Sequence, residues 1–98
     1  MRLANWKKLE GHTFRACRFE EESGASIQLT LGKVADRGSS ERMECYSLYF
    51  AGPPEPYIPQ GMIKLDHDEF EEAIVIFIVP IEQRPDGFGY EAVFNTEI

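Results

Sequence analysis

The most polar stretch of the sequence is Asp66-His67-Asp68-Glu69, which is followed closely by Glu71 and Glu72. Carboxylates and an imidazole in one segment raise the question of a metal site. A calcium loop of the EF-hand type needs alternating oxygen ligands, a glycine at the sixth position and a glutamate at the twelfth, and this spacing is absent. Zinc needs more nitrogen or sulfur ligands than His67 supplies locally. We therefore expect no metal site, and a turn whose Asp side chains bind backbone N–H groups.

A hydrolytic site would need a nucleophile beside a base. The candidate thiols are Cys17 and Cys45, the candidate bases are His12 and His67, and no local spacing pairs them. The glycines of the segment Gly87 to Gly89 follow a turn into an expected strand, whereas a phosphate-binding loop leads from a strand into a helix. The sequence therefore predicts no catalytic residue, no cofactor-binding residue and no enzymatic activity.

Composition limits the remaining classes of function. The 98 residues are 43% hydrophobic and 12% aromatic, which predicts one globular domain covering residues 1–98. The net charge is −7, and no basic run is longer than Lys7-Lys8, so neither nucleic acid nor an anionic membrane is an expected partner. The N-terminus lacks the apolar segment of a secretory signal, which favours the cytoplasm. Two cysteines without a CxxC spacing are expected to be reduced and to face the core.

The longest apolar run, from Ala73 to Ile81, is the segment that the other elements must cover. It is too short for a membrane-spanning helix, which needs about 20 residues. Its Ile and Val content favours a β-strand. Because both faces are apolar, we expect this strand to be buried on both faces. Pro80 is expected to end its pairing, since proline offers no N–H to the ladder.

Five further segments have the composition or alternation of strands: His12–Phe19, Ile27–Val34, Met43–Phe50, Met62–His67 and Phe88–Asn95. The first two flank an acidic turn at residues 20–24, and Gly32 is expected to form a bulge. Together these segments predict an all-β domain of about six mostly antiparallel strands, arranged as a small barrel or a barrel-like sandwich.

We expect the hydrophobic core to centre on the expected strands and Phe77→Ala to cost roughly 3–5 kcal/mol. The expected core residues are Ile27, Leu29, Leu31, Leu48, Leu65, Ile74, Ile76, Phe77, Ile78, Val79 and Phe94. Leu3, Trp6 and Leu9 recur at the spacing of one face of a short helix, which should end at Gly11. Two helical turns are not stable alone in water, so we expect Trp6 to plug an open end of the sheet or barrel.

The segment from Ala51 to Gly61 holds four of the six prolines and cannot enter a central strand. Pro53, Pro56 and Pro59 recur at every third residue, the period of a polyproline II helix. A rigid crossing with Tyr57 and Ile58 packed on the domain and an exposed arm that a partner grips are the two alternatives. We predict that Pro56, Tyr57, Ile58 and Pro59 form part of a protein contact.

The order of several short motifs extends over nearly the whole chain. These are Trp6-x-x-Leu9-x-Gly11-x-x-Phe14, Leu29-Thr30-Leu31, Tyr46 to Phe50 leading into Gly52-Pro53, Gln60-Gly61 before Leu65-x-His67, the apolar strand closing at Pro80, and Tyr90-x-Ala92-Val93-Phe94-Asn95. In these motifs the chain resembles a family of small bacterial domains of unknown function. The resemblance implies an accessory or structural role beside phage-tail-like or tail-collar-type proteins, with no catalytic residues.

These observations favour a non-enzymatic protein-interaction or structural module, in a phage-derived or tail-like assembly. Its expected partner is another protein or a second copy of the chain, so a homo-oligomer is among the expected states. The alternative is a small β barrel that binds a small molecule or catalyses a reaction. That alternative needs convergent polar groups in a concavity, whereas the polar residues of this sequence fall mostly in turns.

Overall fold

The computed structural model describes residues 1–18 and 26–98, in which it has one short helix and six strands. The acidic turn expected at residues 20–24 lies outside the described residues, as does Phe19. The elements are α1 (Leu3–Lys7), β1 (Thr13–Arg18), β2 (Ile27–Asp36), β3 (Met43–Gly52), β4 (Gly61–Asp66), β5 (Ile74–Arg84) and β6 (Gly87–Glu97).

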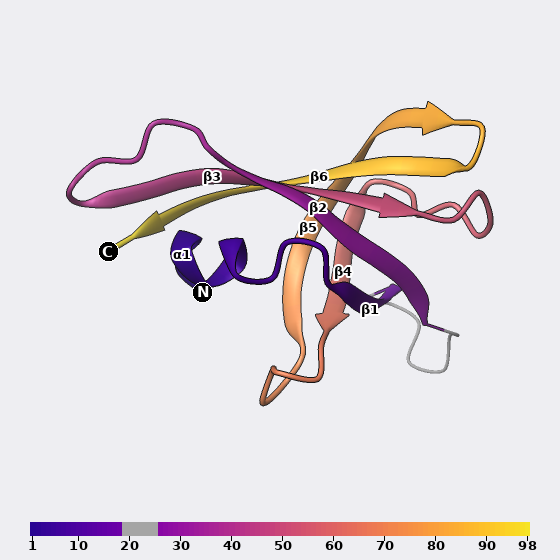
Figure 1. Cartoon of the computed structure of the whole chain (residues 1–98), viewed down its shortest axis with the longest axis horizontal. Coiled ribbons are helices and arrows are strands. Elements are labelled where there is room, and N and C mark those ends of the chain that lie inside the picture. The colour runs from indigo at the N-terminus through magenta and orange to yellow at the C-terminus, as the bar shows by residue number, and fades with distance from the viewer. Residues whose placement is uncertain (19–25) are drawn as a thin grey trace.

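The six strands form a closed antiparallel barrel in the order β1-β2-β3-β6-β5-β4 (Figure 1). The barrel closes where β4 pairs with β1, a contact between segments about 50 residues apart. The strand β5 pairs with β4 through its first half and with β6 through its second half. The predicted all-β fold of six antiparallel strands is thus confirmed as a barrel, in which closure pairs the strand edges.

Two bulges bend the barrel wall. The β2–β3 register shifts between Leu31 and Lys33, which confirms the bulge expected at Gly32. A second shift separates Pro80 from Glu82 in the β5–β6 pair. The expectation that pairing ends at Pro80 is wrong, because β5 continues to pair with β6 as far as Arg84. Proline is tolerated at a bulge, where a regular ladder hydrogen bond is already interrupted.

The side chains of β5 alternate between the barrel interior and its outer surface. Ile76 and Ile78 are buried as expected, but Phe77 is 47% exposed and Val75 is 43% exposed. The predicted burial of both faces is therefore wrong, and Phe77 is not a core residue. A closed barrel has one interior, so only every second residue of a strand can face it.

The rest of the predicted core is largely confirmed. Ile27, Leu29, Leu31, Leu48 and Leu65 are buried, together with aromatic side chains from β1, β3 and β6. The remaining predicted residues are only partly buried: Ile74 and Phe94 pack against the core cluster, and Val79 is half-buried on β5.

The helix α1 and the turn after it close one end of the barrel, as expected of the Trp6 segment. Trp6 is almost fully buried, and its ring lies 6.1 Å from each of the rings of Phe14, Phe70 and Phe94. Gly11 ends the segment in the left-handed conformation, at φ +87°, which glycine adopts without a steric penalty. The Gly11 N–H then donates to the Leu31 carbonyl oxygen at 2.7 Å, which fixes the segment to β2.

The two cysteines lie in strands, but neither is a core residue. Cys17 and Cys45 are both half-buried and unbridged. Each lies next to a buried residue on its strand, Ala16 in β1 and Tyr46 in β3. The thiols are therefore on the outer side of the alternation, and the expectation that they face the core is wrong.

Candidate functional site

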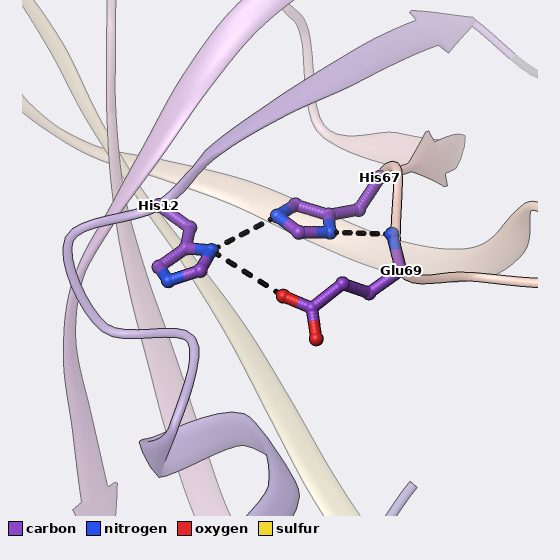
Figure 2. A group of neighbouring side chains, drawn as sticks. All are labelled: His12, His67 and Glu69. Atoms are coloured by element: carbon purple, nitrogen blue, oxygen red, sulfur yellow. Dashed lines mark hydrogen bonds and ion pairs between the residues drawn. The ribbon is translucent and has the colours of Figure 1, made fainter.

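Two histidines that are far apart in the sequence meet at the end of the barrel that Trp6 closes. His12 directly precedes β1 and His67 directly follows β4, and these two strands pair with each other. The Nδ1 atom of His12 lies 3.1 Å from the Nε2 atom of His67 (Figure 2). The closure of the barrel therefore builds this contact.

The ring of His67 is held by its own turn. The backbone N–H of Glu69 donates to His67 Nδ1 at 3.0 Å, and the Phe70 N–H donates to the His67 carbonyl oxygen at 2.9 Å. The residue is 8% exposed, and its ring packs 4.7 Å from the ring of Phe14. His67 is therefore fixed in position, whereas His12 is only half-buried.

The hydrogen bonds assign the proton between the two rings. Because His67 Nδ1 accepts the Glu69 N–H, the neutral His67 ring carries its proton on Nε2. That proton is directed at His12 Nδ1, which acts as the acceptor. In this arrangement neither nitrogen that faces the partner ring offers a lone pair to solvent.

The carboxylates beside the histidines fall into two groups. Glu69 extends its Oε2 atom to 3.9 Å from His12 Nδ1, and the Glu69 side chain is 66% exposed. Arg15 engages the other two, with its guanidinium 2.9 Å from Asp68 Oδ1 and 3.6 Å from Asp66 Oδ2. These two carboxylates raise the pKa of Arg15, with the hydrogen bond to Asp68 as the largest cause. Glu69 is thus the carboxylate that is directed at the histidines.

His12, His67 and Glu69 form a group whose ligand atoms lie within 4.8 Å of one another. The polar stretch of the sequence contains one histidine, which is why no metal site is expected from local spacing. The second histidine of the group, His12, is 55 residues away in the sequence. The available signal was that each histidine is the terminal residue of an expected strand. The two histidines meet because the first strand pairs with the fourth. The alternation of apolar and polar residues along the strands does not predict that pairing.

The other end of the barrel is closed by the proline loop, residues 53–60. Ile58 is buried in the core cluster, and its backbone N–H donates to the Tyr90 hydroxyl at 3.0 Å. Burial raises the pKa of Tyr90, while the hydrogen bond from Ile58 acts in the opposite direction. This contact supports the interpretation of the loop as a rigid crossing.

The predicted protein-contact residues of the loop therefore lie in two environments. Pro56, Tyr57 and Pro59 are exposed, whereas Ile58 is not accessible to a partner. The ring of Tyr57 packs edge-on against Phe88 at 4.9 Å, so the loop presents an aromatic side chain that is held in place.

The outer side of β4 and β5 carries an exposed apolar patch. Met62 and Phe77 are direct cross-strand partners, and Val75 lies two residues before Phe77 on the same face. Met62 and Phe77 are each 47% exposed. We call Met62, Val75 and Phe77 the outer patch. Met62 also lines a small hollow together with Pro59, so the outer patch is continuous with the proline loop.

A family model described as "Domain of unknown function (DUF6916)" matches residues 1–94. The chain belongs to this family. Comparisons with curated proteins and with solved structures found no match. In the part of the chain that the structure describes, no helix is both long and apolar enough to cross a membrane.

Proposed function

We propose that this domain is a non-enzymatic module that binds another protein through the outer patch and the exposed part of the proline loop. The observation that carries the proposal is the Met62–Phe77 pair, which leaves two large apolar side chains about half exposed on adjacent strands. Contiguous apolar surface of this kind is typical of interaction sites.

The structure of the proline loop supports the same proposal. A rigid aromatic side chain loses little conformational entropy on binding, and Tyr is enriched at protein interfaces. Tyr57 has these properties because its ring packs on Phe88 and its neighbour Ile58 is anchored in the core. The loop would therefore bind as a preformed surface, without first having to order.

The charge of the chain indicates the chemistry of the partner. The net charge is −7, so two copies would repel each other, whereas a basic surface would be attracted. We therefore propose a partner with an apolar centre and a basic rim. The sequence resemblance suggests a phage-tail-like assembly as its setting, and we include that setting in the proposal.

The alternative, a small-molecule site, has one observation in its favour. An open groove of about 480 Å³ lies on the outer side of the barrel, between β2–β3 and β5–β6, and Lys33 and Arg84 are among its lining residues. Arg84 is already paired with Glu82 at 2.9 Å. Because the groove is open and one of its two cations is paired within the protein, we favour the interaction module.

Site-specific photo-cross-linking in the native host tests the proposal. A photoreactive residue is placed at position 57 or 77, and the matched control position is Asn95, which is exposed on β6. Asn95 pairs with Cys45 of β3 and lies beyond the residues of β6 that pair with β5, at the end of the barrel away from the proline loop. We expect one protein adduct shared by positions 57 and 77 and absent at position 95. Identical adducts at all three positions, or none, would overturn the proposal.

A further inference from the structure

We propose that His12, His67 and Glu69 bind one divalent transition-metal ion of the Zn²⁺ class. The ligands are His12 Nδ1, His67 Nε2 and a carboxylate oxygen of Glu69. This site lies beside the Trp6 plug, and its occupation does not depend on the interaction surface proposed above.

The distances fit this assignment. Ligand bonds of about 2.0–2.2 Å in a tetrahedral Zn²⁺ site place neighbouring ligand atoms roughly 3.3 Å apart. The two histidine nitrogens are already 3.1 Å apart. Glu69 Oε2 is 3.9 Å from His12 Nδ1, and its mostly exposed side chain has room to move closer.

The ligand types select the ion. Two imidazoles and one carboxylate suit Zn²⁺ and its neighbours in the first row, whereas Ca²⁺ and Mg²⁺ prefer oxygen ligands alone. Among the described residues the group includes no carboxylate other than Glu69, and the neighbouring Asp66 and Asp68 are both engaged by Arg15. Three protein ligands leave one position for water or for a side chain of a partner.

Metal binding requires one proton to move. His67 Nε2 carries the proton in the structure, so this nitrogen becomes a ligand only after the proton has shifted to Nδ1 through solvent. The Glu69 N–H must then turn away from Nδ1, because two donors cannot face each other. The lost hydrogen bond is a modest cost. Because Glu69 supplies both this N–H and the third ligand, movement of its peptide couples the two events.

A bound ion would link two parts of the fold. His12 lies between the Trp6 segment and β1, and its carbonyl oxygen accepts the Leu31 N–H at 3.0 Å. His67 and Glu69 lie in the β4–β5 turn. The ion would therefore fix the plug to that turn, and we expect the melting temperature to rise by several degrees at saturating Zn²⁺.

Calorimetric titration of the metal-free chain with Zn²⁺ tests the proposal. We expect one ion per chain with a dissociation constant in the micromolar range or below. His12→Gln should weaken binding at least 30-fold and Glu69→Gln about tenfold. Glu71→Gln is the matched control, because it changes an exposed carboxylate in the same turn and should leave the affinity unchanged. The His12 side chain is 42% exposed, the Glu69 side chain is 66% exposed and Glu71 is exposed, so these variants should fold.

Nitrogen-15 NMR of the histidine rings provides a second, independent readout. We expect His67 to carry its proton on Nε2 without metal and on Nδ1 with one equivalent of Zn²⁺. The proposal is overturned if Zn²⁺ does not bind below about 100 μM, if His12→Gln and Glu71→Gln bind it equally, or if the His67 proton stays on Nε2 at saturation. These results do not depend on whether the cross-linking experiment finds a protein partner. Each of the two proposals can therefore be refuted without refuting the other.

Discussion

Ile76→Ala and Phe77→Ala form a matched pair that tests the orientation of β5. The residues are neighbours in the sequence, but Ile76 is buried in the core cluster and Phe77 is 47% exposed. Removing a buried Ile side chain costs about 2–5 kcal/mol, through lost transfer free energy and the cavity that remains. Full burial of a Phe side chain contributes about 1.5–3 kcal/mol. A half-exposed Phe should therefore contribute about 1 kcal/mol.

The difference should be large compared with the stability of a small domain, which is typically about 5–15 kcal/mol. For a chain of this length, 1 kcal/mol corresponds to about 4–8 °C in melting temperature. We expect Ile76→Ala to melt about 8–40 °C below the parent and Phe77→Ala about 4–8 °C below it. Phe77→Ala should therefore remove a large side chain from the outer patch while the domain stays folded.

Chemical denaturation followed by tryptophan fluorescence is a suitable assay, because Trp6 is the single tryptophan and is buried at one end of the barrel. The m-value should be the same for both variants, since each exposes the same surface on unfolding. If Phe77→Ala is as destabilising as Ile76→Ala, or more so, the register of β5 is shifted by one residue and the outer patch does not exist.

Two further predictions concern the ends of the barrel. Tyr90→Phe removes the acceptor of the buried Ile58 N–H and should cost about 1–3 kcal/mol; hydrogen exchange at Ile58 should become faster, and unchanged exchange would contradict the anchoring role. At the other end, the Leu3 N–H donates to Glu44, and this bond is the largest cause of a lowered Glu44 pKa. The resulting stability is present above the ordinary carboxyl pKa of about 4.3 and is lost as the pH falls through the lowered value. Acid titration of Trp6 fluorescence should show this loss in the parent and not in Glu44→Gln, whose signal should already resemble the acid form at pH 7.

The sequence predicted the parts of the fold that depend on local patterns. Alternating apolar residues revealed the strands, and the spacing of Leu3, Trp6 and Leu9 revealed the plug. The orientation of β5 was not predictable, because both of its faces are apolar and only barrel closure decides which face is covered. Phe77 was consequently assigned to the core, whereas the structure places it on the outer surface.

The candidate sites show the same limit. The polar stretch around His67 was visible in the sequence. The second histidine, His12, precedes β1, and no local signal in the sequence specifies that β1 pairs with β4. In the proline loop, composition left a rigid crossing with Tyr57 and Ile58 packed on the domain and an exposed arm as alternatives, and it did not separate the buried Ile58 from the exposed Tyr57. The hydrogen bond between Ile58 and Tyr90 joins residues 32 positions apart, and it separates Ile58 from its exposed neighbours.

Sedimentation of the labelled domain in lysate of its native host tests whether the outer patch binds another protein. Three proteins are compared: the parent, Phe77→Glu on the outer patch, and Asn95→Glu, which adds the same charge at an exposed position of β6 away from the outer patch and the proline loop. We expect the parent and Asn95→Glu to sediment as a complex of one defined mass, and Phe77→Glu to sediment as a folded monomer. Light scattering of the purified parent should give a monomer, which separates binding of another protein from self-association. A complex that persists in Phe77→Glu, or monomeric sedimentation of all three proteins, would refute binding through the outer patch.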